Sequence, residues 1–388
     1  MLNMDYNDKY LKYKSKYLYL KKGGAAEAIP LDDIIKKTTN IFKDILKEHA
    51  FIRLEHKKYE LKSYSEEEYE LFYKGDNYTL KKGEIISSGS FGIVTECKLT
   101  NINTQKTEEI ALKTIKIDHK KKDHEKSFIK ELLNLEKINN ICHTDIVCFT
   151  GYFMSPDKNI YCVMTESLIK KGMMTLENYM NSKKNNITPL DSLKIIRNIS
   201  EAVKKLHDFD LVHLDIKKAN IMINKETLGI KLLDFGLSCK DLNDKTDLIN
   251  ECSDIHGSNF NFAPEFSVKL ENVNSQFFDR KRDWKKADIW TIGGIFYRLL
   301  KNGSYPPVYY ESSSEKGKVA LNFNDGAYFY INIQTPELEL ESNDKLTDNQ
   351  NSAINKLVES ALKKYPVDRP KIGDFIDEID KVMELFPE

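Results

Sequence analysis

The chain has 388 residues, in which 59 Lys and Arg stand against 60 Asp and Glu, so its formal net charge is −1. This length suffices for one large or two modest domains with a buried core, and the charge balance gives no argument for a nucleic-acid partner. Six cysteines lie far apart without a CxxC pair, which argues against a zinc site or a dense disulfide framework: Cys97, Cys142, Cys148, Cys162, Cys239 and Cys252. We therefore expect reduced thiols and a cytoplasmic location.

Residues 1–22 form a basic, tyrosine-rich leader. Its tyrosines recur at the spacing of one helical face, and its lysines interrupt any apolar run, so neither a secretory signal nor a membrane span is expected. A solvated or docked helical tail is one interpretation, and a basic helix that contacts a membrane surface or a partner is the other. The leader resembles the "KYLKYKxKYLxLKK" segment of proteins from giant amoeba-infecting DNA viruses, which implies a viral protein in the host cytoplasm or the virion.

The next segments differ in texture. Residues 23–77 read as an N-terminal extension: "GGAAEA" is typical of a hinge, and residues 30–76 are charged with weak helical periodicity. Short β-rich runs begin at Tyr78, and long helical patterns follow Leu190. This order predicts an α+β fold with a β-rich lobe and a helical lobe.

Two stretches of the β-rich part contain groups suited to phosphate. "IISSGSFGIVTE" places Gly89 and Gly92 between two strands, where backbone amides can approach phosphate oxygens, although this stretch alone favours a plain hairpin turn. "IALKTIK" places Lys113 in an alternating strand, either as a surface residue or as a cation for a ligand. The helical stretch "EKSFIKELLNLEKIN" then puts Glu131 beside its apolar face, as a solvated acid or as the partner of Lys113.

Two later motifs carry oxygen and nitrogen ligands. "VHLDIKKANIMI" supplies Asp215, Lys217 and Asn220, and "IKLLDFG" leads an apolar strand into Asp234. Asn220 and Asp234 offer the oxygen ligands that Mg²⁺ accepts, which leaves Asp215 to orient and deprotonate a hydroxyl. Each fragment alone is also compatible with an ordinary loop.

In this order, the motifs resemble those of a eukaryotic-type serine/threonine protein kinase over roughly residues 78–385. The resemblance implies a bilobal protein kinase fold, with a small β-rich N-lobe at about 78–164, a mainly helical C-lobe at about 168–385 and an insertion at about 302–348. It also implies ATP and Mg²⁺ as cofactors, with Mn²⁺ as an alternative, and proteins with Ser or Thr hydroxyls as substrates.

The same resemblance implies residue roles. Lys113, paired with Glu131, anchors phosphates, Asp215 is the catalytic base, and Lys217 contacts the transferred phosphate. Asn220 and Asp234 hold the metal, and Met164 is the gatekeeper that precedes a hinge at Thr165, Glu166 and Ser167. The implied ATP-binding residues are Ile86, Ser87, Ser88, Gly89, Ser90, Phe91, Gly92, Val94, Ala111, Lys113, Met164, Glu166, Ser167 and Met222.

Motifs outside the nucleotide site favour a protein substrate. "FAPEF", "ADIWTIGG" and "YPVDRP" match kinase motifs at Glu265, Asp288 and Arg369, and the resemblance implies a buried ion pair between Glu265 and Arg369. Lys217, and Ser258 in "GSNFNFAPE", match the serine/threonine pattern. A regulatory stack is implied at Leu135, Phe149, His213 and Phe235, with His213 as a packed core histidine.

Two positions depart from the family pattern. Ser87 replaces the first glycine of the loop, which predicts modestly weakened nucleotide handling. Leu214 replaces the arginine that usually meets a phosphate on the activation segment, and Asp254 stands where that phosphate usually lies. We therefore expect catalysis without activation-segment phosphorylation. The alternatives are a pseudokinase or scaffold that binds partners, and a small-molecule kinase.

Overall fold

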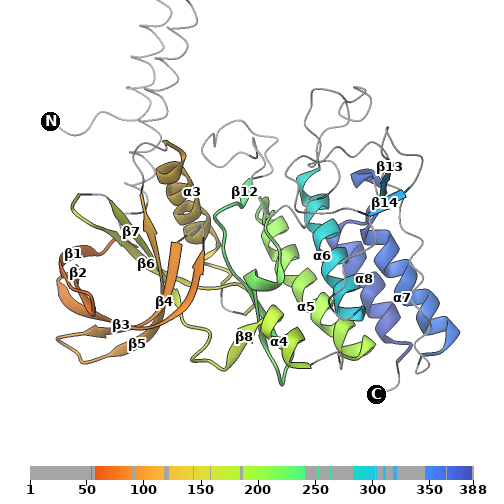
Figure 1. The fold of residues 1–388 in the computed structure, drawn as a ribbon, viewed down its shortest axis with the longest axis horizontal. Helices are drawn as coiled ribbons and strands as arrows, with labels where there is room; N and C mark the ends of the chain where they lie inside the picture. The colour runs from red at the N-terminus through yellow and green to blue at the C-terminus, as the bar shows by residue number, and fades with distance from the viewer. Residues whose placement is uncertain are drawn as a thin grey trace, which may run out of the picture. The chain divides into compact units, whose positions relative to one another are not determined.

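The computed structural model describes residues 54, 57–89, 92–117, 122–142, 144–157, 159–183, 187–240, 252, 263, 283–301, 303, 309–311, 318–320, 346–363 and 365–386. In this part of the chain, a large β-sheet precedes a group of helices (Figure 1). The order agrees with the α+β, two-lobed architecture predicted from the sequence.

An antiparallel sheet with strand order β1-β2-β3-β4-β5-β7-β6 forms the first lobe of the described chain. Its strands are β1 (Glu60–Tyr64), β2 (Glu68–Tyr73), β3 (Asp76–Gly89), β4 (Gly92–Asn101), β5 (Thr107–Lys116), β6 (Phe149–Met154) and β7 (Ile160–Glu166). On one face, alternate residues such as Leu112 and Met164 build an apolar core. Because successive side chains of a strand point to opposite faces, Lys113 lies on the other face.

Strands β1 and β2 overturn one expectation. Residues 30–76 were expected to be weakly helical, yet residues 60–73 extend the sheet. The reason is alternation: Tyr69 and Leu71 are buried in the core while Glu68 and Glu70 are not, which is the period of a strand with one face covered. The predicted boundary at residue 78 therefore falls inside a continuous sheet. Residues 1–53, with the basic leader, lie outside the described residues.

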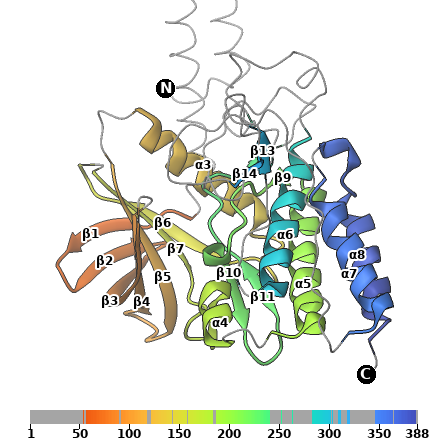
Figure 2. The same ribbon diagram turned by 45° about the vertical axis from the view of Figure 1, so that its right-hand side comes forward.

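Helix α3 (Lys122–Ile138) packs against this sheet, as Figures 1 and 2 show. The predicted apolar face is confirmed, because Phe128, Leu132, Leu135 and Ile138 are all buried. The Phe128 ring lies 4.5 Å from the ring of Tyr161 on β7. This contact fixes the helix beside the strand that leads into the second lobe.

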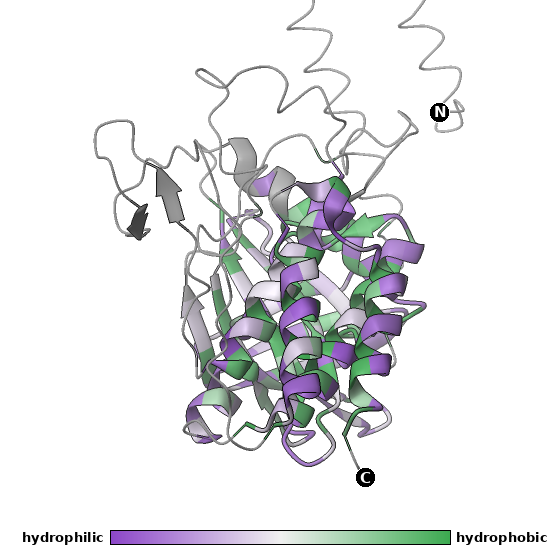
Figure 3. Ribbon diagram, turned by 90° about the vertical axis from the view of Figure 1, so that its right-hand side faces the viewer, coloured by the Kyte–Doolittle hydropathy of each residue, from purple (hydrophilic) through white to green (hydrophobic). Residues whose placement is uncertain are grey.

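The second lobe is mainly helical. Its long helices are α5 (Pro189–Asp208), α6 (Trp284–Leu300), α7 (Asp348–Ala361) and α8 (Ile372–Met383), and α5 packs against both α6 and α8. Along these helices, hydrophobic residues are interspersed with hydrophilic ones, as Figure 3 shows and as is typical of helices with one buried face. The side chain of Thr188 caps α5, with Pro189 after it, and Thr347 and Gln350 form a capping box at α7.

Short elements complete the lobe and bound the candidate site. They are β8 (Met173–Thr175), α4 (Leu176–Lys183), β9 (Leu211–Val212), η2 (Lys218–Asn220), β10 (Ile221–Asn224), β11 (Ile230–Leu232), β12 (Cys239–Lys240), β13 (Tyr309–Glu311), β14 (Lys318–Ala320) and η5 (Pro366–Asp368). Strands β11, β10 and β8 form one small sheet, β12 pairs with β9, and β13 pairs with β14. The last pair lies within the predicted insertion. None of the helices in the described ranges is long and apolar enough to cross a membrane.

Two disulfides contradict the expectation of six reduced thiols. Cys142 is bonded to Cys148, and Cys239 to Cys252, with Cα–Cα distances of 4.9 and 5.1 Å. Each pair is brought together by the local course of the chain, which sequence spacing without a CxxC motif does not reveal. The remaining two, Cys97 and Cys162, are free and buried in the sheet core, and burial raises the pKa of each thiol to about 12.

The contact between α6 and α7 generates a stability prediction. A Cβ at Gly293 would lie 2.7 Å from the Cβ of Ala361, whereas a Cβ at the neighbouring Gly294 meets no heavy atom within 4 Å. We expect Gly293→Ala to lower the free energy of unfolding by about 1–3 kcal/mol through overpacking. Gly294→Ala is the control and should raise it by about 0.5–1 kcal/mol, because alanine restricts the unfolded helix segment. Urea unfolding measures both, and equal stability of the two variants would contradict the packing described.

Candidate active site

A buried ion cluster joins the two lobes. Lys113 Nζ on β5 lies 2.7 Å from Glu131 Oε1 on α3 and 3.3 Å from Asp234 Oδ1 after β11. Burial by itself opposes the charge on Lys113, but the two carboxylates outweigh it and raise the pKa of this ammonium. Burial likewise favours the neutral form of Asp234, but Lys113 and the Gly236 amide lower the pKa of that carboxyl overall. The expected pair of Lys113 with Glu131 is therefore present, and Asp234 joins it.

The catalytic-loop candidates converge on one carboxylate. Asp215, only 5% exposed, follows β9, and its Oδ2 accepts hydrogen bonds from Lys217 Nζ at 2.8 Å and Asn220 Nδ2 at 2.9 Å. Asn220 also donates to the Asp215 carbonyl, so the turn is closed from both sides. Charged and neutral donors on a carboxylate fix its direction, which suits a group that orients a hydroxyl. The structure brings Asp215, Lys217 and Asn220 together as the sequence predicted.

Asp288 on α6 holds the backbone of this loop. Its carboxylate accepts hydrogen bonds from the amides of His213 at 3.0 Å and Leu214 at 2.9 Å, and it lies 2.9 Å from His207 Nε2. Leu214 has a φ of +61°, in the left-handed region that L-residues rarely adopt. Because the Asp288 side chain is 1% exposed, these bonds are made away from water and compensate for that backbone conformation.

His213 is a packed core histidine, as expected. It is fully buried, its Nδ1 accepts from the Asp215 amide at 3.3 Å, and its Nε2 lies 3.0 Å from the Leu233 carbonyl. These bonds assign the proton to Nε2. Its ring centroid lies 5.1 Å from that of Phe235. Leu135 and Phe149, the other members of the implied stack, are also buried.

The residues expected to hold a divalent cation have suitable oxygens. The Nδ2 group of Asn220 donates to Asp215, so its Oδ1 points elsewhere, and in the described part of the chain neither Asn220 Oδ1 nor Asp234 Oδ2 accepts a hydrogen bond. Asp234 has a φ of +59°, in the left-handed region that L-residues rarely adopt. An amide and a carboxylate oxygen fit the preference of Mg²⁺, whose remaining ligands would be water and phosphate.

The glycine-rich turn needs glycine at one position. Gly92 has a φ of +117°, and a Cβ there would lie 2.4 Å from the Thr114 carbonyl oxygen. It pairs with Gly89 across the β3–β4 hairpin, where Ser88 opposes Ile93 and Ser87 opposes Val94. Ser90 and Phe91, at the tip, lie outside the described residues.

The predicted adenine-binding residues converge in part. Val94 is paired with Lys113, and Ala111 is two residues along the same strand, so all three share one face of the sheet. Ile86 and Met222 both line a cavity of about 620 Å³, together with residues of β8 and the loop after β7. Val94, Ala111 and Lys113 are not among the residues that line this cavity.

The hinge differs from the prediction by one residue. Met164 is fully buried in the sheet core with its partner Leu112, on the face opposite Lys113. Thr165 pairs with Ala111 and therefore faces the side that carries Lys113. Assigning Met164 as gatekeeper was wrong, because a shift of one residue in a strand moves each side chain to the other face.

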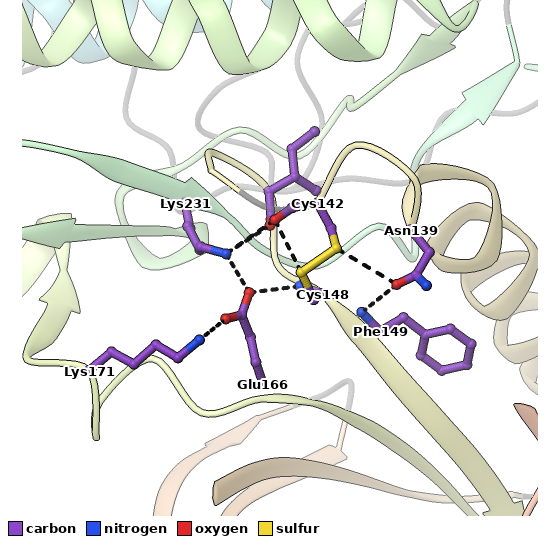
Figure 4. Close-up of a disulfide and its surroundings, with 8 residues drawn as sticks. Asn139, Cys142, Cys148, Phe149, Glu166, Lys171 and Lys231 are labelled. Carbon is purple, nitrogen blue, oxygen red and sulfur yellow. Dashed lines mark hydrogen bonds and ion pairs between the residues drawn. A yellow bond between two sulfur atoms is a disulfide. The ribbon is translucent and has the colours of Figure 1, made fainter. Parts of the chain in front are cut away.

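The other hinge residues are engaged elsewhere. Ser167 is 2% exposed, and its amide donates to the Glu109 carbonyl at 3.1 Å, so that amide is not presented to a ligand. The carboxylate of Glu166 forms ion pairs with Lys231 and with Lys171 (Figure 4). By alternation along β7, Glu166 lies on the face away from Lys113. Burial raises the pKa of Glu166, but the two ammonium groups outweigh it and the net shift is downward.

Lys231 is the residue that sequence reasoning missed. It is 7% exposed on β11, where its Nζ donates to the carbonyls of Cys142 at 3.1 Å and Ile146 at 3.3 Å and pairs with Glu166. The sequence contains the signal, because a lysine inside the apolar run "IKLLDFG" requires a buried partner. The identity of that partner, 65 residues earlier, is visible only in the structure.

Arg369 is 2% exposed and packs over the ring of Trp290, 5.1 Å from its centroid. Its guanidinium donates to the carbonyls of Lys363 at 2.8 Å and Lys286 at 3.0 Å. Glu265, its predicted ion-pair partner, lies outside the described residues, as do Asp254 and Ser258. The predicted Glu265–Arg369 pair therefore stays a prediction.

The role of Asp288 can be tested by a substitution that keeps its shape. In Asp288→Asn, one acceptor oxygen becomes an NH₂ group that faces backbone N–H donors. We expect the free energy of unfolding to fall by about 2 kcal/mol, the scale of a lost buried hydrogen bond to a charged group. Asp283→Asn is the control, because Asp283 caps the same helix and asparagine caps equally well. A similar loss in both variants, in urea unfolding, would contradict the anchoring role.

Comparison with known proteins places these residues in a family. Residues 80–379 match the family described as "Protein kinase domain". The chain is 30% identical over 234 residues to myosin light chain kinase A of Dictyostelium discoideum, which covers 60% of this chain and 69% of that protein. It is 24% identical over 302 residues to dual specificity protein kinase shkC of the same organism, covering 77% and 51%, and 27% identical over 242 residues to serine/threonine-protein kinase 33 of Mus musculus, covering 60% and 43%.

The match thus spans between about two fifths and two thirds of these curated relatives. It covers more than half of the present chain and contains the ion cluster, the catalytic-loop candidates and Asp288. The chain therefore belongs to the eukaryotic-type protein kinase family.

Proposed function

We propose that this chain is an active serine/threonine protein kinase that transfers the γ-phosphoryl group of Mg–ATP to Ser or Thr hydroxyls of proteins. The observation that carries the proposal is the fixed carboxylate of Asp215, held by Lys217 and Asn220. The Lys113–Glu131–Asp234 cluster supplies the second half of the site, because it presents a buried ammonium between two lobes. Together these groups meet the needs of phosphoryl transfer, which depends on positioning and charge neutralisation.

In the proposed reaction, Asp215 orients the substrate hydroxyl and takes its proton as the oxygen attacks the γ-phosphorus. The new O–P bond forms while the bond from the γ-phosphorus to the bridging oxygen breaks, and ADP leaves with that electron pair. Lys217 contacts the transferred group, and Lys113 holds the remaining phosphates. Mg²⁺, or Mn²⁺, bound by Asn220 and Asp234 would neutralise charge on the phosphate oxygens.

For the nucleoside, we propose a hinge shifted by one residue from the sequence-based assignment. Thr165 takes the gatekeeper position in place of Met164, since it shares a face with Ala111 and Lys113. Ile86, Val94, Ala111 and Met222 enclose the base, and the backbone around Glu166 borders it. The sheet of the kinase domain proposed at 78–385 is then extended at its edge by β1 and β2, which precede that range.

A protein substrate with Ser or Thr is favoured by Lys217, which matches the serine/threonine pattern and contacts Asp215. Two of the relatives reported above bear the names of a myosin light chain kinase and a serine/threonine-protein kinase, and a third is named a dual specificity kinase. Phosphoamino-acid analysis of a generic protein substrate separates these cases. Tyrosine as the main product would overturn the serine/threonine assignment, and transfer only to small molecules would favour the small-molecule kinase.

We further propose a viral origin, a cytoplasmic or virion location, and a leader that contacts a membrane surface or a partner. These proposals rest on the sequence of residues 1–22 alone. The scaffold alternative has less support, because the ion cluster and the Asp215 turn are both complete.

Asp215→Asn tests the catalytic proposal. The amide keeps the shape but cannot accept the hydroxyl proton, so we expect turnover to fall at least about a hundredfold. Transfer of labelled phosphate from ATP in the presence of Mg²⁺ measures it. Asp191→Asn, in the first turn of α5, is a matched control and should behave as wild type. Undiminished transfer by Asp215→Asn would remove this residue from the mechanism, and no transfer by wild type would favour the scaffold.

Leu214 tests the proposed independence from phosphorylation. An apolar side chain cannot pair with a phosphate, and the backbone of Leu214 is held by Asp288 instead. We therefore expect complete phosphatase treatment to change the rate of transfer less than about twofold, well under the effect of losing a charge-assisted contact. Mass spectrometry confirms that the phosphate has been removed. Loss of activity on dephosphorylation would show that the segment uses another phosphate receptor.

A further inference from the structure

The turn between α3 and β6 is closed by the Cys142–Cys148 disulfide (Figure 4). This turn contacts Glu166, at the end of β7. Its two ends make different contacts. The carbonyl of Cys142 accepts from Lys231 Nζ at 3.1 Å. The amide of Cys148 donates to Glu166 Oε1 at 2.9 Å, and the Cys148 carbonyl accepts from the Glu166 amide at 3.0 Å. The disulfide therefore joins the two backbone positions that hold Lys231 and Glu166.

This arrangement ties a buried charge to the turn. Lys231 is 7% exposed, and its ammonium depends on the Glu166 carboxylate and on the carbonyls of Cys142 and Ile146. A buried ammonium that loses part of its hydrogen bonding becomes costly, so the position of the turn and the position of Glu166 are coupled. The next residue of β11, Leu232, also bonds the turn at Asp145 and Val147, and it stands two residues before Asp234.

The two cysteines differ in access. Cys142 is 2% exposed, whereas Cys148 is partly exposed. A thiol that attacks the disulfide at Cys148 has a route from solvent, and disulfide exchange depends on such access. The free cysteines, Cys97 and Cys162, lie buried in the sheet core, where a raised pKa also keeps them as thiols.

We infer that Cys142 and Cys148 form a reversible redox modification site that sets the affinity of the hinge for nucleotide. The inference rests on the proposed binding of ATP at this cleft. The oxidant is a low-molecular-weight disulfide such as oxidised glutathione. Two protein thiols and one oxidised glutathione give the protein disulfide and two glutathione thiols. Dithiothreitol reverses the change, returns both protons to the cysteines and is itself oxidised to its cyclic disulfide.

Reduction alters the contacts of the turn in two ways. It removes the covalent link between positions 142 and 148, and it turns Cys148 Sγ into a donor 3.2 Å from the Cys142 carbonyl. That carbonyl is the one that accepts from Lys231, so the new thiol competes with the ammonium. Partial loss of one hydrogen bond to a charged group corresponds to about a tenfold change in an equilibrium constant. We expect ATP to bind the oxidised protein about tenfold more tightly.

The test uses the full chain, oxidised with glutathione disulfide or reduced with dithiothreitol and then freed of reagent. Mass spectrometry of proteolytic peptides establishes whether Cys142 and Cys148 are linked. Calorimetry with ATP and Mg²⁺ gives the dissociation constant of each form. The expected result is a linked pair after oxidation and a dissociation constant about tenfold lower than that of the reduced protein. No link after oxidation, or constants within twofold of each other, would overturn the inference.

Two variants separate this site from the second disulfide. Cys148→Ser should bind ATP as reduced wild type does and should not respond to oxidation. The double variant Cys239→Ser/Cys252→Ser should keep the full response, because it leaves the hinge turn intact. A response that persists in Cys148→Ser, or vanishes in the double variant, would assign the effect to the other pair. Failure of both wild-type forms to bind ATP would instead refute the proposed nucleotide function.

Discussion

The buried ammonium of Lys113, shared by Glu131 and Asp234, is the interaction on which the arrangement of the site depends. It joins three elements that are distant in sequence: a strand of the sheet, the helix on its face and the segment that follows β11. A buried charge is tolerated only when its partners are in place, so each of the three elements restricts the other two. The two lobes are therefore aligned by electrostatics at the point where a phosphate chain would lie.

A second buried charge, that of Asp288, supports the C-lobe side of the site. Asp288 gives its carboxylate to the amides of His213 and Leu214, and so fixes the turn that presents Asp215. The two clusters have different structural roles. The Lys113 cluster sets the distance between the lobes, while the Asp288 cluster sets the direction of one side chain within the C-lobe. Neither requires a phosphorylated residue, which is consistent with leucine at position 214.

Sequence reasoning predicted best where residue type and chemistry are strictly linked. Asp215, Lys217 and Asn220 were expected to converge, and they do, because few residue types can replace them in that turn. It failed where the outcome depends on pairing. The strands at residues 60–73 belong to a sheet whose partner strand lies further along the chain. The gatekeeper was misplaced by one residue because only the register with Ala111 decides which face a hinge side chain occupies. Lys231 and the disulfides likewise depend on neighbours that folding alone brings together.

Helix α6 connects two features that look unrelated. Asp288 near its start holds the catalytic turn, and Gly293, little more than one helical turn later, lets the helix approach Ala361 of α7. A helix moves as a stiff rod over so short a distance, so a displacement at the α7 contact is transmitted to the amides of His213 and Leu214. The packing of α6 on α7 and the orientation of Asp215 therefore depend on the same short stretch of α6. A larger residue at position 293 would therefore strain the same short stretch of helix that carries Asp288, in addition to the core.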